Sequence, residues 1–358
     1  MRGAALLSGD RQTVFSTIAL FAILLLVLLL PFFVRKVEAN LEVFLFAMGL
    51  LAVTASSQWA WPLVEEGLLE PIKITVAVLV AGLFFKFLRP ALRKAVDSSM
   101  RTMGVKAFAF VVVVLLGLCS SVITAIIAAL ILVEVIDCMR LARVDEVKLV
   151  VVACFAIGMG AVLTPLGEPL ATIVIAKLKG EPYNAGFWFL FKEFWRFVVP
   201  GVLAFAALAA VIVKKGPEEG SQSEDSAEGV KGILLRTAKT YFFVMALVFL
   251  GMGFKPIVDA YISKLPPAGL FWLNSISAIL DNATLAAAEI SPSMSRAQLA
   301  FSLLGLIISG GMLIPGNIPN IICAGKLKIK SKEWIAVGVP LGAVAMGVYF
   351  VALLVYGA

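Results

Sequence analysis

The stretch GAVLTPLGEPLATIVIAKLK, residues 160–179, decides the fold because a related stretch, GGMLIPGNIPNIICAGKLK, stands at residues 310–328. Both stretches begin with small residues, contain two prolines in a P-x-x-x-P pattern and end in Lys-x-Lys. Proline lacks the N–H that a helix interior needs, so each Pro/Gly cluster predicts an interrupted helix. Two interrupted helices at corresponding places predict a chain built from two related halves.

The composition predicts that both halves lie in a membrane. Hydrophobic residues make up 61% of the 358 residues and charged residues only 15%, which is far from the composition of soluble domains. Runs such as residues 14–34 reach the roughly 20 residues that cross a hydrocarbon core as a helix, and no series of short alternating segments indicates a barrel. We therefore expect an all-α polytopic membrane protein.

Several of the apolar segments have an unusual length. Segment 107–136 is too long for one upright crossing and too short for two, which predicts a re-entrant hairpin interrupted at residues 119–121. Segment 267–289 aligns with it, with Ser275 matching Ser120 and Glu289 matching Glu134, and is predicted to be a second hairpin. The expected segments are 14–34, 41–54, 72–88, 107–136, 148–178, 187–213, 233–258, 267–289, 297–326 and 334–356.

The distribution of basic residues orients these segments. Lys and Arg gather in the loop at residues 89–106 and in KLKIKSK, residues 326–332. Both loops fall on the cytoplasmic side if the two hairpins are re-entrant. The protein then crosses the cell (inner) membrane eight times, and both termini lie on the outer side. The net charge of +7 then reflects this bias, and we expect no nucleic-acid partner.

The order of segments predicts two inverted repeats. Each half holds a helix, a re-entrant hairpin, a broken transmembrane helix and a final helix, which amounts to three net crossings. An odd number of crossings inserts the second half upside down relative to the first, as in secondary transporters with a site at the midplane. The expected parts are N-terminal transmembrane helices at 1–71, a first repeat at 72–213, a flexible cytoplasmic linker at 214–232 and a second repeat at 233–358. Two extra helices, 14–34 and 41–54, have no counterpart in the second repeat.

Polar residues interrupt an apolar run at LNSISAILDNAT, residues 273–284, the expected tip of the second hairpin. An ionised Asp alone near the bilayer midplane costs several kcal/mol, so Asp281 should be protonated, paired with a cation, or alternate between the two. The alternative is that Asp281 only caps the second arm of the hairpin. Together with Asp281, hard oxygen ligands of the kind that sodium prefers would come from Asn282, Ser275, Ser277 and Thr284.

Glu168, in the first Pro/Gly cluster, is a second candidate carboxylate, and its repeat position carries the neutral Asn317 or Asn320. The alternative is that Glu168 is solvated near the outer surface. Glu134 and Glu289 are expected close to the headgroups, where an exposed carboxylate needs no special role, and Lys177 and Lys326 are expected to reach toward the membrane interfaces. The remaining candidate ligands are Thr164, Ser120, Ser121 and Thr124.

At NSISAILDNATLAA, residues 274–287, and IPGNIPNIICAGKLKIKSKEW, residues 314–334, the sequence resembles the ion-transporter superfamily. It is most similar to the sodium/proton antiporter and arsenite-transporter branch, and especially to a group described only as predicted cation transporters. The resemblance covers residues 72–356, and its most specific element is S-A-x-L-D-N-x-T at 277–284, where the family places hairpin-tip ligands. The first hairpin departs from the family pattern, because SSVITAII at 120–127 replaces a second L-D-N motif. The resemblance implies a homodimer in which substrate domains move like an elevator along a scaffold.

These observations predict a secondary active transporter that exchanges sodium for protons through membrane-embedded carboxylates and needs no cofactor. Sodium-coupled transport of a small anion is the alternative, and a channel would need a continuous pore. A membrane-embedded enzyme is disfavoured because the chain has no His and no paired catalytic carboxylate motif. The four cysteines lack metal-ligand spacing and are expected to be packing residues: Cys119, Cys138, Cys154 and Cys323.

Overall fold

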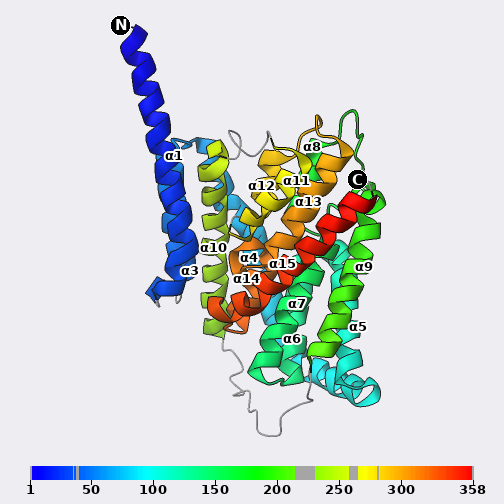
Figure 1. The fold of residues 1–358 in the computed structure, drawn as a ribbon. Coiled ribbons are helices and arrows are strands. Elements are labelled where there is room, and N and C mark those ends of the chain that lie inside the picture. The colour runs from blue at the N-terminus through cyan, green and yellow to red at the C-terminus, as the bar shows by residue number, and fades with distance from the viewer. Residues whose placement is uncertain are drawn as a thin grey trace.

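The computed structural model describes residues 2–34, 36–37, 40–213, 230–257, 265–279 and 282–356. Within these ranges all regular structure is helical (Figure 1). The elements are α1 (Arg2–Phe33), α3 (Leu41–Ala55), α4 (Trp61–Met103), α5 (Val105–Ile123), α6 (Ala125–Met139), α7 (Arg143–Ala161), α8 (Pro169–Lys177), α9 (Phe189–Ile212), α10 (Val230–Ile257), α11 (Pro267–Leu273), η2 (Asn274–Ala278), α12 (Asn282–Glu289), α13 (Arg296–Gly310), η3 (Ile314–Gly316), α14 (Ile318–Lys326) and α15 (Ser331–Tyr356).

Both Pro/Gly clusters interrupt a helix, as the sequence predicts. The first separates α7 from α8, and the second separates α13 from α14, with only the short turn η3 between them. The predicted interruption at residues 119–121 lies slightly later, at Thr124 between α5 and α6. Helix α5 continues through the two serines because their hydroxyls donate to the carbonyls three residues back, Ser120 to Gly117 at 2.6 Å and Ser121 to Leu118 at 2.7 Å.

Helices α4 and α10 extend beyond the predicted segments. Helix α4 is 43 residues long and carries Pro71 and Pro90 inside it, although the sequence predicts a helix only over 72–88. A proline removes one backbone hydrogen bond, but the turns on either side of each proline remain helical. Helix α4 therefore continues to Met103 and ends at Gly104, where φ is +80°. Helix α10 begins at Val230, so it includes the last three residues of the predicted linker. Residues 214–229 of that linker lie outside the described residues.

Four helices among the described residues are long and apolar enough to cross a membrane, which is consistent with a membrane protein. One of them is α5, with 19 residues, although the sequence predicts it as one arm of a hairpin. The arms of the other predicted hairpin, α11 and α12, have 7 and 8 residues and are too short to cross. The candidate spans are Val105–Ile123, Phe189–Ile212, Thr237–Ile257 and Ser331–Tyr356.

Helices α3, α4 and α10 form one closely packed group, with α1 against α3 (Figure 1). Their approach depends on glycine, because a Cβ on Gly253 would lie 2.5 Å from the Cβ of Ala52, and one on Gly49 would lie 2.9 Å from the Cβ of Phe249. Small residues allow helices to approach this closely in membranes. The contact of α10 with α3 and α4 also contains a separate hydrophobic cluster, which consists of Val53, Leu63, Met245 and Phe249.

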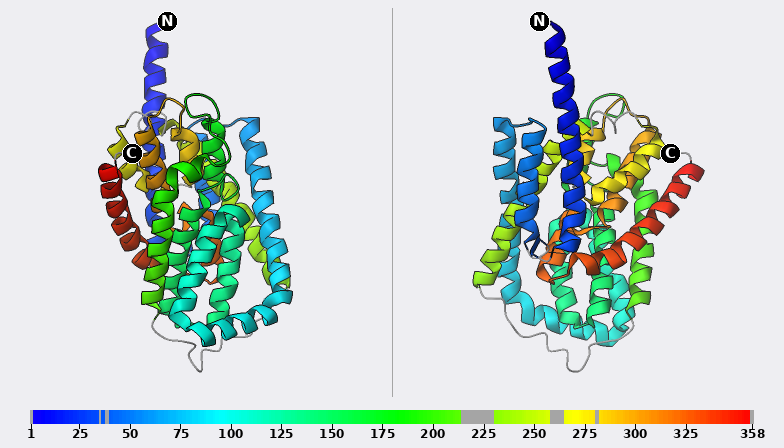
Figure 2. Two further views of the ribbon diagram at one scale, coloured as in Figure 1. Left: turned by 90° about the vertical axis from the view of Figure 1, so that its right-hand side faces the viewer. Right: turned by 60° about the vertical axis from the view of Figure 1, so that its left-hand side comes forward.

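The remaining helices form a second group, in which elements from the two halves of the chain contact each other. Helix α6 packs on α14, and α8 packs on α12. Helices α5 and α6 lie toward the lower end of Figure 1, whereas α8, α11 and α12 lie toward the upper end. The start of α1 and the end of α15 also lie toward the upper end (Figures 1 and 2). The two chain ends therefore share one end of the bundle.

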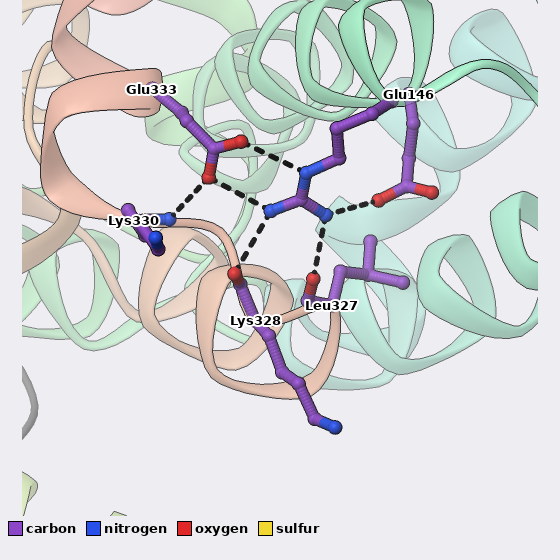
Figure 3. Close-up of polar contacts among 6 residues, drawn as sticks. Glu146, Leu327, Lys328, Lys330 and Glu333 are labelled. Carbon is purple, nitrogen blue, oxygen red and sulfur yellow. Dashed lines mark hydrogen bonds and ion pairs between the residues drawn. The ribbon is translucent and has the colours of Figure 1, made fainter. Parts of the chain in front are cut away.

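Arg143, the first residue of α7, joins this helix to the turn between α14 and α15 (Figure 3). Its Nε and Nη2 donate to the two carboxylate oxygens of Glu333 at 2.9 and 2.8 Å. Its Nη1 donates to Glu146 at 2.7 Å and to the carbonyl of Leu327 at 2.9 Å, and Nη2 also reaches the carbonyl of Lys328 at 2.9 Å. All five N–H donors of the guanidinium are thus used.

We expect Arg143→Lys to lower the thermal unfolding temperature of the detergent-purified protein, because an ammonium cannot reproduce the fork geometry of these bonds. The loss should be about 1–2 kcal/mol, since charge-assisted bonds are stronger than neutral ones but the site is partly exposed. Arg296→Lys is the matched control, because Arg296 makes one exposed pair with Glu193 at 2.8 Å. Equal unfolding temperatures for the two variants would show that the Arg143 contacts do not hold α7 to α14.

Candidate functional site

The two helix interruptions have closely similar backbones. Glu168 precedes α8 with φ −156° and ψ 160°, and Asn317 precedes α14 with φ −155° and ψ 147°. Each residue is followed by a helix of 9 residues that carries a proline in its first turn. Asn317, and not Asn320, therefore occupies the position equivalent to Glu168. The two interruptions present a carboxyl group on one side and a neutral amide on the other.

The first interruption is attached to the junction between α5 and α6. The N–H of Ala125 donates to the carbonyl of Gly167 at 2.8 Å, and the Thr164 hydroxyl donates to the carbonyl of Ser121. Thr124, at the junction itself, has φ +76° and ψ 147°, a region that residues other than glycine rarely adopt. The bonds on either side hold this unusual backbone in place.

The predicted ligands of the first hairpin are mainly used for helix packing. Ser120 is buried, and its hydroxyl also approaches the carbonyl of Ile157 on α7 at 3.0 Å. The Thr124 hydroxyl accepts from the N–H of Ile127 at 3.4 Å and so caps α6. The hydroxyl protons of Ser120 and Ser121 point to backbone carbonyls, which leaves only their lone pairs for a ligand.

Three asparagines gather at the second interruption. The Asn320 amide nitrogen donates to the carbonyls of Gly310 and Leu313 at 2.8 and 2.9 Å. A Cβ on Gly310 would lie 3.6 Å from Nδ2 of Asn282, so the start of α12 reaches the same place. A Cβ on Gly158 of α7 would lie 2.6 Å from Nδ2 of Asn317. Elements α7, α12, α13 and α14 therefore converge there on side-chain amides.

Two polar side-chain atoms at the second interruption have no hydrogen-bond partner among the described residues. Asn282, Asn317 and Asn320 are all buried. Among the described residues, Nδ2 of Asn282 and Oδ1 of Asn320 have no hydrogen-bond partner. The orientation of Asn320 follows from its two carbonyl acceptors, which require the nitrogen on that side. A buried donor and a buried acceptor without partners are costly, which is typical of a place that receives a ligand.

Glu168 is 6% exposed, so the alternative that it is solvated near the surface is wrong. Its backbone carbonyl accepts from the N–H of Thr172 at 3.3 Å, which starts α8. Thr164, four residues earlier, is also buried. Both residues therefore lie inside the protein at the first interruption, within a part of the chain that packs on α12 through α8.

The remaining candidates of the second hairpin are only partly described. Asp281 lies outside the described residues. Ser277 and Thr284 belong to η2 and α12 by their backbone. The Ser275 side chain is exposed. Helix α12 is described from Asn282 onward, and the role of Asp281 as a ligand or as a helix cap stays a prediction.

A network that the sequence does not predict lies beside this site. The Glu289 carboxylate oxygen Oε2 accepts from Nδ2 of Asn274 at 3.0 Å and from the Ser302 hydroxyl at 2.8 Å. The Ser309 hydroxyl donates to the carbonyl of Asn274 at 2.6 Å. Ser302 and Ser309 stand seven residues apart in α13 and so share one helix face, which is the one sequence signal that points to this network.

Both matched glutamates are buried, so the expectation that their carboxylates are exposed is wrong. Glu134 forms an ion pair with Lys326, and the two side chains are 8% and 16% exposed. The Lys177 ammonium donates to the carbonyl of Ala287. Each lysine ends one broken helix and contacts an element of the other half, Lys177 on α12 and Lys326 on α6. That the lysines reach toward the membrane interfaces stays a prediction. The lysines find partners across the two halves because α6 packs on α14 and α8 on α12.

The chain matches the model of a known protein family. It matches the family described as "Protein of unknown function (DUF1646)" over residues 17–356. Since the match covers nearly the whole chain, the protein belongs to the DUF1646 family. No curated protein matches it.

Proposed function

We propose that the protein is a secondary active transporter that exchanges a monovalent cation, sodium, for protons. The observation that carries this proposal is the convergence of buried asparagine side chains at the second helix interruption, where the amide oxygen Oδ1 of Asn320 has no hydrogen-bond partner among the described residues. Interrupted helices provide free carbonyls and amides inside a membrane, and such backbone is tolerated where protein, water or a ligand satisfies it. Amide and carboxylate oxygens suit a hard cation such as sodium.

We further propose that the two halves are inverted repeats with re-entrant hairpins. The opposite placement of α5 and α6 against α11 and α12 (Figure 1), the equivalent backbones at Glu168 and Asn317 and the crosswise lysine contacts support this arrangement. In this proposal, the group of α1, α3, α4 and α10 is the scaffold of a homodimer, and the other helices move past it like an elevator. The protein would reside in the cell (inner) membrane with both termini outside.

The cation would bind between the two interruptions. Asp281 and Glu168 provide carboxylates, and Asn282, Asn317 and Asn320 provide amide oxygens. Ser275, Ser277, Thr284 and Thr164 stand as further oxygen donors in this proposal. Alternating access follows if the loaded site moves across the membrane while the scaffold stays in place, so that only one side has access at a time.

Reconstitution of the purified protein into liposomes tests this function. A pH gradient is imposed, and the entry of sodium, lithium or potassium is measured together with the change in internal pH. The proposal expects saturable sodium uptake coupled to loss of internal protons. Flux that is unsaturable and runs only down its own gradient would indicate a channel.

Sodium-coupled uptake of a small anion is the second candidate, and one observation favours it. The helix N-termini of α8 and α14 lie at the interruptions, and Nδ2 of Asn282 is a buried donor without a partner among the described residues. Helix N-termini and free N–H groups attract anions. The same liposomes distinguish the two functions if a sodium gradient at constant pH drives uptake of a labelled carboxylate, arsenite or phosphate.

A further inference from the structure

The Glu289 carboxyl group is buried in a polar cluster outside the proposed cation site. Glu289 is 2% exposed and Asn274 is 1% exposed. Oxygen Oε2 of Glu289 has two donors, the amide of Asn274 and the hydroxyl of Ser302. The second carboxyl oxygen, Oε1, and the amide oxygen Oδ1 of Asn274 have no hydrogen-bond partner among the described residues. The cluster therefore contains two acceptors and lacks a donor.

Among the described residues, no basic side chain forms an ion pair with Glu289. Helix α12 packs on α8, α10, α13 and η2. On these elements Lys177 donates to the carbonyl of Ala287, Arg296 pairs with Glu193, Lys239 pairs with Glu42, and Lys255 is exposed. The described part of the chain thus contains no ion pair with Glu289. Glu134, at the matched position of the first half, has its charge balanced by Lys326.

An ionised carboxylate in such a place is unfavourable, because burial removes water and one oxygen has no donor. A proton on Oε1 removes the charge and turns this oxygen into a donor. The same proton can supply the donor that Oδ1 of Asn274 lacks. One proton thus removes the charge and adds the donor that the cluster lacks.

We propose that Glu289, held by Asn274 and Ser302, is the site that binds the exchanged proton. This inference rests on the proposed function and assigns the proton to a group separate from the cation ligands. A proton from water on one side binds Oε1 and neutralises the carboxylate. It returns to water on the other side when the carboxylate is formed again, while sodium travels in the opposite direction.

The cluster is connected to the second helix interruption. The carbonyl of Asn274 accepts from the Ser309 hydroxyl at 2.6 Å, and Ser309 directly precedes Gly310, the last residue of α13. The carbonyl of Gly310 accepts from Asn320 at 2.8 Å. Loss of the proton from Glu289 leaves Oδ1 of Asn274 without its donor, and a shift of Asn274 is passed through Ser309 to the asparagines at the interruption. Proton release and cation binding are coupled in this way.

Infrared difference spectroscopy and transport together test the proposal. At neutral pH the wild-type protein should show the carbonyl stretching band of a protonated carboxyl group, and Glu289→Gln should lack it. The same variant should move at least tenfold fewer protons per sodium ion in liposomes, because a glutamine amide keeps the hydrogen bonds but does not titrate. Glu193→Gln, at the exposed pair with Arg296, is the control and should keep both the band and the coupling.

A second variant covers the case in which Glu289→Gln fails to fold. Ser302→Ala keeps the carboxyl group but removes one donor from Oε2, so the band should remain and shift in frequency. An unshifted band in Ser302→Ala, or a band and coupling ratio unchanged in Glu289→Gln, would overturn the assignment. A wild-type protein that moves no sodium would contradict the exchange function, whereas the infrared band would still report on the protonation of Glu289.

Discussion

Gly160→Ala should prevent the protein from folding to its stable form. Gly160 lies in α7 where this helix crosses α5, and a Cβ there would lie 1.7 Å from the carbonyl oxygen of Gly117 and 2.6 Å from its carbon. Atoms of a backbone cannot move aside as a side chain can, so the two helices must separate. Overpacking of a close contact costs about 1–3 kcal/mol when the neighbours are flexible, and a backbone neighbour should bring the cost to the upper end or beyond.

The measurement is the yield of monodisperse protein in detergent and its thermal unfolding temperature. Gly347→Ala is the matched control, because a Cβ on this residue of α15 meets nothing within 4 Å. Alanine favours a helix over glycine by up to about 1 kcal/mol, so the control should be as stable as the wild type or more so. A normal yield of Gly160→Ala would show that α5 and α7 are farther apart than described.

Asp281→Asn should abolish sodium/proton exchange while the protein still folds. An asparagine keeps the size and a neutral oxygen ligand but loses the negative charge that balances a cation in a low-dielectric place. Loss of a charged ligand contact of about 3 kcal/mol corresponds to about a hundred-fold weaker binding. Sodium uptake into liposomes under an imposed pH gradient measures the effect.

Asp97→Asn provides the comparison for this prediction, because Asp97 is a partly exposed residue of α4 outside the proposed site. It should exchange sodium like the wild type. If Asp281→Asn also retained full exchange, Asp281 would have no part in the mechanism and the cation would depend on Glu168 and the asparagines. If Asp281→Asn unfolds at the wild-type temperature, its loss of exchange is due to the lost cation ligand and not to misfolding.

The helix interruptions could be predicted from the sequence because their cause is local. Proline has no N–H, and its ring clashes with the preceding turn of a helix. Pro165 and Pro315 therefore predict the two interruptions without any information about the helices that pack around them. The length of α4 could not be predicted in the same way. Pro71 and Pro90 also stand in it, yet the helix continues, because packing against α6 and α10 outweighs the loss of one hydrogen bond at each.

The polar contacts could not be predicted because they join residues far apart in the chain. Glu134 and Lys326 are each typical of residues that face headgroups, and only the packing of α6 on α14 brings them together. Asn274 belongs to the polar stretch that the sequence singles out, but its partners Ser302 and Glu289 stand in α13 and α12. Short-range patterns singled out the polar stretch at residues 273–284 but could not reveal the network around Asn274.

The Glu134–Lys326 pair has a consequence for how the chain is made. Ribosomes synthesise the first half before the second, so Glu134 is inserted while the codon for Lys326 is still untranslated. A buried carboxylate without a counter-charge is unfavourable, so the first half alone must keep Glu134 neutral or in contact with water. Only when α14 arrives does the acidic group gain its counter-charge. Lys326 thus stabilises Glu134 only after the second half has been synthesised and α14 packs on α6.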